Sequence, residues 1–303
     1  MSGLSWLIVG CAAALGSAAA WALGSILFRR IGEEASPLGM NLGKGLLGLL
    51  LLGGALLVTG WQPMDGRTVA SLAVSGVVGI ALGDTFFFMA LVRLAPRLTL
   101  LLGTVGQVIT VIMAMLFLGE RPAPLCWAGI PLVLGGVAWV LAEQLPIEDR
   151  AGRRVRLAGI GWGLGASLCI SAGFILAKVG LAEVSALQGT FWRFAFGMAG
   201  LATFGWVRGD LGAWLRPFAR PALLRRILGA VAVVTFGGFW LTMVGFKYAP
   251  ASIATVLMST EPLFVLPLAR LMLSERVTPR AVAGAALAVT GVVAILLGAG
   301  QGP

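Results

Sequence analysis

The chain has 303 residues, of which 59% are hydrophobic and only 11% charged, and its formal net charge is +10. A soluble domain would carry about 25% charged residues, so this composition excludes an ordinary water-soluble protein. It predicts an all-α membrane protein in which the basic excess reports where the loops lie relative to the membrane. The charge is therefore no evidence for nucleic acid as a partner.

The residue types that most often carry catalysis or bind metals are scarce. The chain contains no histidine, which removes histidine metal sites, proton relays and triads with an imidazole base. Cys11, Cys126 and Cys169 all lie in apolar runs, which indicates neither a disulfide framework nor a metal cluster. We therefore expect no enzymatic activity, no cofactor and no metal site.

Ten apolar segments are long enough to cross the hydrocarbon core as helices, which takes about 20 residues. Two less apolar stretches interrupt the chain at 143–156 and 208–223, and the first of them divides it into halves. The expected spans are 5–28, 38–59, 69–92, 98–118, 124–142, 157–179, 186–207, 224–246, 251–273 and 279–298.

The two halves repeat one another. Ala95-Pro96 recurs as Ala249-Pro250, 154 residues later, and Glu120-Arg121 recurs as Glu275-Arg276, 155 residues later. Between positions 117 and 141, 10 of 25 residues are identical to those 155 positions on. Such self-similarity indicates an internal duplication. We expect two domains, 1–148 and 149–303, each a repeat of five helices.

An odd number of helices per repeat makes the second half enter the membrane from the opposite face. Two inverted repeats are a construction of secondary transporters, with the substrate site near the midplane between them. At an offset of 149, Lys44 in the second span aligns with Arg193 in the seventh. Loops on one side of the ten spans hold sixteen of the 22 Lys and Arg residues and the opposite loops hold four. The positive-inside rule then predicts that both termini lie outside the cytoplasm.

These features resemble the EamA-type permeases of the drug/metabolite transporter superfamily. The segment 258–262 (Met-Ser-Thr-Glu-Pro) followed by 273–276 (Leu-Ser-Glu-Arg) is similar to the ninth helix of that family and its following turn. A basic residue in the second helix of each repeat, here Lys44 and Arg193, is similar too. The resemblance implies export of amino acids or related metabolites. It also implies cytoplasmic termini, against the charge count.

Four ionisable residues fall well inside expected spans, where each is unfavourable by roughly 2.5–3.5 kcal/mol. Lys44 and Asp84 both lie about 10–12 Å deep from the same side, at 1.5 Å per residue. They are predicted either to form a structural ion pair or to act in transport, with Asp84 as a proton carrier and Lys44 meeting an anionic substrate.

Arg193 and Glu261 lie deeper in the second repeat. Arg193 either lines a substrate site or snorkels to the headgroups. Glu261 either pairs with Arg193 or carries the coupling proton, and as the acid nearest mid-bilayer it is our first candidate for proton coupling, with Asp84 second.

Three further residues complete the predicted substrate site. Gln107 aligns with Glu261 at the offset of 154 and either contacts substrate or makes an interhelical hydrogen bond. Trp192, beside Arg193, and Trp21 belong to a group of aromatic residues that either line the site or simply pack. Glu120 and Glu275 are interpreted as caps or ion-pair partners at helix junctions.

The sequence thus predicts a secondary active transporter in the cell inner (plasma) membrane, multi-pass, working as a monomer or homodimer. We expect it to export a small molecule, an amino acid or other carboxylate, by proton-coupled exchange. The alternative is a non-transporting structural membrane protein, or a lipid flippase or scramblase on the same fold. Substrate would contact Lys44, Arg193, Gln107, Trp192 and Trp21, and the bilayer is the only other expected partner.

Overall fold

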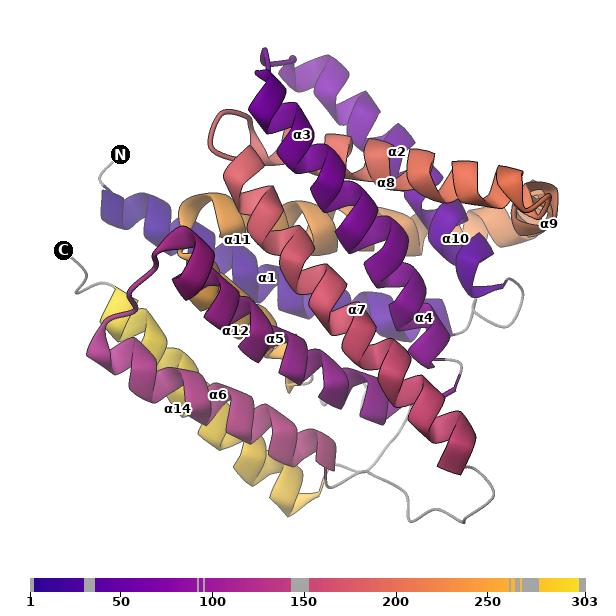
Figure 1. Cartoon of the computed structure of the whole chain (residues 1–303). Coiled ribbons are helices and arrows are strands. Elements are labelled where there is room, and N and C mark those ends of the chain that lie inside the picture. Colours follow the sequence, from indigo (N-terminus) through magenta and orange to yellow (C-terminus); the bar gives the residue numbers. More distant parts are fainter. Residues whose placement is uncertain are drawn as a thin grey trace.

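The computed structural model describes residues 3–29, 36–91, 93–94, 96–142, 153–261, 263–264, 268 and 278–299. Within these ranges all regular secondary structure is helical (Figure 1). The helices are α1 (Gly3–Arg29), α2 (Pro37–Thr59), α3 (Gly66–Ser75), η1 (Gly76–Asp84), α4 (Thr85–Leu91), α5 (Pro96–Leu118), α6 (Pro124–Ala142), α7 (Arg153–Gly180), α8 (Ala186–Val207), α9 (Leu211–Leu215), η3 (Arg216–Ala219), α10 (Pro221–Ala232), η4 (Val233–Trp240), α11 (Leu241–Tyr248), α12 (Ala251–Met258) and α14 (Pro279–Ala299).

Six helical segments of the described residues are long and apolar enough to cross a membrane. They are Gly3–Gly24, Pro37–Thr59, Gly66–Leu91, Leu157–Gly180, Pro221–Tyr248 and Pro279–Gly298. Shorter apolar stretches occur in α5 and α6. The expected ninth span is described as α12 and a turn at Ser259 and Thr260, and most of the remainder of that span lies outside the described residues. The chain is therefore a multi-pass helical membrane protein, and the count of ten spans stays a prediction.

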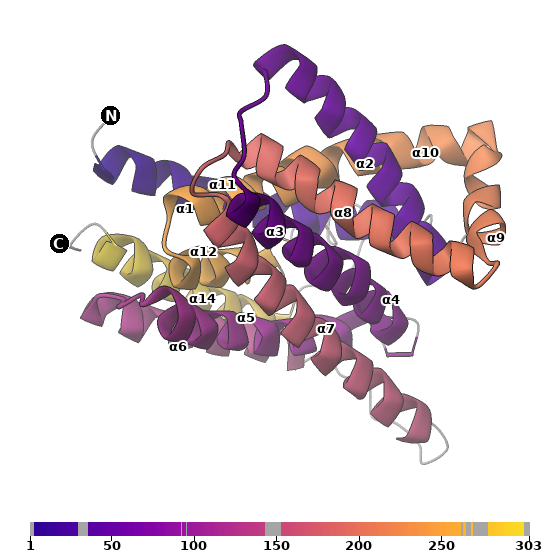
Figure 2. The ribbon, with the colours of Figure 1, turned by 45° about the horizontal axis from the view of Figure 1, so that its top comes forward.

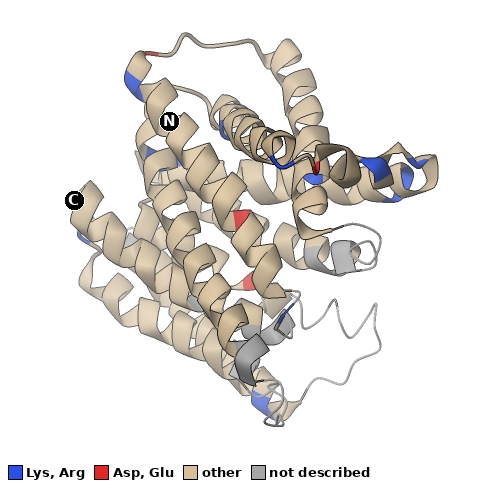
Figure 3. Cartoon of the chain, turned by 45° about the vertical axis from the view of Figure 1, so that its right-hand side comes forward, with Lys and Arg blue, Asp and Glu red and all other residues tan. Residues whose placement is uncertain are grey.

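Charged residues are distributed as a bilayer requires. Figure 3 shows Lys and Arg gathered at the ends of the helices, while most of each helix is uncharged. Large apolar side chains point outward, among them Leu57 and Val58, which are 81% and 89% exposed. The start of α1 and the end of α14 lie at the same end of the bundle, and α9 lies at the opposite end (Figure 2).

The last helices of the two halves, α6 and α14, pack side by side (Figure 1). A Cβ added to Gly129 would lie 2.7 Å from the carbonyl oxygen of Gly291, and one added to Gly136 would lie 2.6 Å from that of Gly284. Gly129 and Gly284 are repeat equivalents, as are Gly136 and Gly291, so the contacts cross as in an isologous interface. Small residues allow this close backbone approach.

The second helices of the two repeats begin in the same way. Ser36 caps α2 by accepting a hydrogen bond from the N–H of Gly39, and Ser185 caps α8 by accepting one from Gln188. The two serines are 149 residues apart, the same offset as Lys44 and Arg193. Each cap therefore places its basic residue eight positions further along the helix, within the buried face.

The third helix of each repeat contains a π-helical segment at its centre. η1 interrupts the helix from Gly66 to Leu91, and η4 interrupts the helix from Pro221 to Tyr248. When the sequences of the two repeats are aligned at the Ala-Pro offset of 154 residues, the positions of η1 overlap those of η4. π-Helical turns are rare and are often found at functional sites. Asp84 is the last residue of η1.

Candidate functional site

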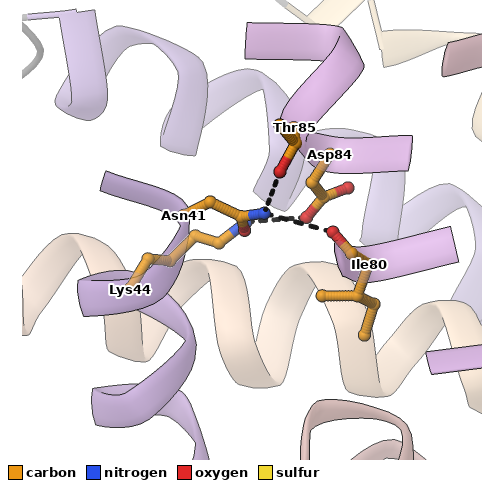
Figure 4. Close-up of polar contacts among 5 residues, drawn as sticks. All are labelled: Asn41, Lys44, Ile80, Asp84 and Thr85. Carbon is orange, nitrogen blue, oxygen red and sulfur yellow. Dashed lines mark hydrogen bonds and ion pairs between the residues drawn. The ribbon is translucent and has the colours of Figure 1, made fainter. Parts of the chain in front are cut away.

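Lys44 of α2 and Asp84 at the end of η1 form a salt bridge, with 2.9 Å between Nζ and Oδ2 (Figure 4). The lysine side chain is 5% exposed and the aspartate side chain 18% exposed. The predicted ion pair is confirmed. An ion pair removed from water depends on good geometry and further hydrogen bonds, so the surroundings of the pair decide what it can do.

The pair is flanked by a second polar link between the same two helices. Asn41 lies one turn before Lys44 on α2, and its Nδ2 donates to the carbonyl oxygen of Ile80 at 3.1 Å and to Oγ1 of Thr85 at 3.5 Å. Figure 4 shows Asn41 and Lys44 both pointing from α2 toward Asp84 and Thr85. The residues around the junction of η1 and α4 are thus held to α2 by polar contacts on either side of Asp84.

Two aromatic rings cover the lysine ammonium. Lys44 Nζ lies 5.5 Å from the ring centroid of Phe88 on α4 and 4.9 Å from that of Phe239 on η4. Both distances suit a cation–π interaction. Trp21 of α1 packs edge-on against Phe239, with 4.8 Å between ring centroids. The structure therefore connects the predicted Trp21 with Lys44 and Asp84 through Phe239.

Arg193 of α8 is only 3% exposed and is surrounded by neutral groups. Its Nε donates to Ser75 Oγ at 2.7 Å, its Nη1 lies 3.1 Å from Met243 Sδ, and its guanidinium lies 5.6 Å from the ring centroid of Phe174. The snorkelling alternative is wrong, because these contacts hold the guanidinium among helices.

Glu261 is not brought to Arg193. It is partly buried, it follows the turn that ends α12, and neither residue is paired with the other among the contacts of the described residues. The suggested Glu261–Arg193 pair is therefore wrong. Arg193 instead faces η1, because Gly76, Gly79 and Gly173 let α8, η1 and α7 pack closely around it.

Gln107 and Trp192 both lie apart from the ion pair. Gln107 Oε1 accepts a short hydrogen bond from Thr255 Oγ1, which links α5 to α12 and is the interhelical bond given as one of the two alternatives. Trp192 packs against Phe191, Phe196 and Trp61. Its Nε1 is buried and has no hydrogen-bond partner among the described residues.

The sequence reasoning missed two polar residues of the site. Asn41 could have been noticed as a lone amide on the same face as Lys44, three residues away. Ser75 gives no such signal, because small hydroxyl residues are common in membrane helices and usually bond to their own backbone. In the part of the chain that the structure describes, no group of three or more Cys, Asp or Glu side chains could hold a metal ion.

Comparison with known proteins identifies the fold and the family. The model of the EamA-like transporter family matches residues 8–142 and 157–297. No curated protein matches the chain. A solved structure described only as "Crystal structure of protein" has a TM-score of 0.74 and 18% sequence identity, and the match covers 98% of this chain and 99% of the other. That likeness supports the fold and says nothing of substrate.

Proposed function

The chain belongs to the EamA-like transporter family, and from that premise we propose that it exports a small charged metabolite in exchange for protons. Membership of this family establishes that the chain is a membrane transporter of the drug/metabolite type. The proposal adds the solute, an amino acid or other carboxylate, the coupling to protons, the absence of enzymatic activity and a location in the inner membrane.

One observation carries the coupling: the carboxylate of Asp84 holds the buried cation Lys44, which occupies the same repeat position as the buried Arg193. Lys44 Nζ lies 2.9 Å from Asp84 Oδ2. Protonating Asp84 removes the negative charge with which Lys44 pairs. A proton and any ligand that requires the ionised carboxylate therefore exclude one another at Asp84, which is the condition for exchange.

The same arrangement suggests how an anionic group would bind. Arg193 is buried without a carboxylate at hydrogen-bonding distance among the described residues. An unpaired buried charge is unfavourable by several kcal/mol, so a ligand carboxylate would be bound strongly there. We therefore keep Arg193 and Lys44 as candidate contacts for the solute carboxylate, while Gln107 and Trp192 have weaker support.

The geometry reverses the order of the two proton-coupling candidates. Asp84 contacts a cation directly, whereas Glu261 contacts none among the described residues. Coupling requires that protonation change the affinity for substrate, so the acid that holds the binding cation is favoured. We propose Asp84 as the coupling residue and retain Glu261 as the second candidate.

The test is transport by purified protein in liposomes, using solutes selected by a thermal-shift screen, because a bound ligand stabilises the folded state. Asp84→Asn is expected to lose both solute-for-solute exchange and acceleration by a pH gradient, because the solute and the proton both require the ionised Asp84 carboxylate. Glu261→Gln and the control Asp210→Asn, which alters an exposed loop acid, should keep both. Undiminished gradient-driven transport by Asp84→Asn would overturn the assignment.

The same liposomes can test the alternative function. If no solute moves and fluorescent lipids exchange between leaflets, the chain is a scramblase and the transport proposal is wrong. Loss of acceleration in Glu261→Gln instead of Asp84→Asn would keep the transport function and move the coupling to Glu261.

A further inference from the structure

The ammonium group of Lys44 lies among contacts that a free ammonium ligand would also make. Asp84 Oδ2 accepts its hydrogen bond at 2.9 Å, and the rings of Phe88 and Phe239 face it at 5.5 Å and 4.9 Å. A carboxylate gives a charge-assisted hydrogen bond and aromatic faces attract cations. These three groups come from η1, α4 and η4, so they form a binding arrangement around the lysine head.

Two buried oxygen atoms beside this arrangement have no partner within the described part of the chain. They are Asn41 Oδ1 and Thr235 Oγ1, and neither makes a hydrogen bond there. Asn41 lies one turn before Lys44 on α2. Thr235 lies near Gly48, one turn after Lys44, since a Cβ added to Gly48 would lie 2.9 Å from its Oγ1. Unsatisfied buried acceptors are unfavourable, and N–H donors of a ligand would satisfy them.

The Lys44 ammonium donates no hydrogen bond to either of these two oxygen atoms. Its ammonium has three N–H donors, and among the described contacts only one of them is donated, to Asp84. The lysine head is fixed by its own side chain to α2, which also carries Asn41. A free ammonium group has no such tether, and it could reorient toward Asn41 or Thr235 while keeping Asp84 and the two rings.

We propose that Asp84, Phe88 and Phe239 form a binding site for a primary ammonium group, and that Lys44 is its resident occupant, which a solute ammonium displaces. The inference rests on the proposed transport function and names the solute's cationic end. Displacement exchanges one ion pair for two when the solute is a zwitterion: the solute ammonium pairs with Asp84, and the freed Lys44 pairs with the solute carboxylate. A proton on Asp84 would exclude the ammonium, which gives exchange.

The first test removes the Lys44 side chain and measures whether a free amine binds in its place. Lys44→Ala removes three methylenes and the ammonium, which together correspond to propylammonium. Propylammonium chloride should raise the Tm of Lys44→Ala saturably, by about 2–5 °C at ten times its Kd. Sodium chloride and 1-propanol at the same concentrations should not. Lys44→Met fills the same volume without charge, so it should not respond, and adding Asp84→Asn to Lys44→Ala should abolish the response.

The readout is stability, so it can succeed or fail independently of transport. A propylammonium effect no larger than that of 1-propanol, or one that persists without Asp84, would overturn the proposal. If Lys44→Ala aggregates, the same additives are supplied during expression and extraction. Recovery of folded protein only with propylammonium supports the site, and aggregation under all conditions overturns it.

The second test concerns displacement in the wild-type chain. Propylammonium must compete there with Lys44, so a saturable rise in Tm is expected at a Kd at least tenfold weaker than for Lys44→Ala, and it should vanish in Asp84→Asn. A wild-type protein that shows no such Asp84-dependent rise up to the solubility of the amine would overturn the displacement. Phe88→Leu should weaken binding severalfold in the Lys44→Ala background, because the cation loses one aromatic face.

Discussion

Glu120 accepts two hydrogen bonds from Ser252, one from the backbone N–H at 2.9 Å and one from the hydroxyl at 2.7 Å. Its other oxygen accepts the N–H of Ala251 at 2.6 Å. A carboxylate positioned just after the end of α5 thus caps the first turn of α12, the equivalent helix of the other repeat. The prediction that Glu120 is a cap or an ion-pair partner is confirmed as a cap, and Glu275 lies outside the described residues.

Replacing this cap should destabilise the fold. We expect Glu120→Ala to lower the free energy of unfolding by about 1–2 kcal/mol, because up to three N–H and O–H donors lose their acceptor and the helix dipole loses a stabilising anion. Glu120→Gln keeps one acceptor oxygen and should lose less. The measurement is thermal unfolding in detergent. Arg121→Ala, which alters the adjacent exposed charge, is the control, and an equal loss in that variant would contradict the capping role.

The end of the bundle that carries the termini should lie outside the cytoplasm. Five arginines lie between the end of α8 and the second turn of α10, around α9, which Figure 2 shows at the opposite end of the bundle: Arg208, Arg216, Arg220, Arg225 and Arg226. Basic loops are retained on the cytoplasmic side. A C-terminal phosphatase fusion should therefore be active and a C-terminal fluorescent-protein fusion dark. The reverse pattern would show the orientation that the family resemblance implies.

Close packing of α6 on α14 should make Gly136 intolerant of a side chain. Its added Cβ would meet the backbone N of Ala288 and the carbonyl oxygen of Gly284, both at 2.6 Å, and backbone cannot move aside as a flexible side chain can. Gly136→Val should destabilise the protein by about 1–3 kcal/mol through overpacking. Gly135 has nothing within 4 Å, so Gly135→Val is the matched control and should be nearly neutral in thermal unfolding.

The sequence predicted those features that depend on repeat and depth. Equal depth on neighbouring helices predicted the pairing of Lys44 with Asp84. The internal repeat predicted that Lys44 and Arg193 occupy equivalent positions, and both lie eight residues after a serine cap on a buried face. It could not predict the partners of Arg193, because hydropathy gives the depth of a residue and not the rotation of its helix. The π-helical segments were also missed, since a π turn and an α turn present the same apolar composition to lipid.

The Lys44–Asp84 pair should show strong energetic coupling in a double-mutant cycle. Removing one partner leaves a buried charge without compensation, so Lys44→Met and Asp84→Leu should each destabilise the protein by about 3–5 kcal/mol. The double variant replaces both charges by apolar groups and should recover much of that loss.

The control is the exposed pair Arg208–Asp210, with 3.1 Å between its charged atoms and side chains 60% and 44% exposed. Its coupling should be only about 0.2–1 kcal/mol, because water screens it. If the losses of the two single variants simply add in the double variant, the salt bridge does not stabilise the folded protein, and its retention would have to be explained by ligand binding alone.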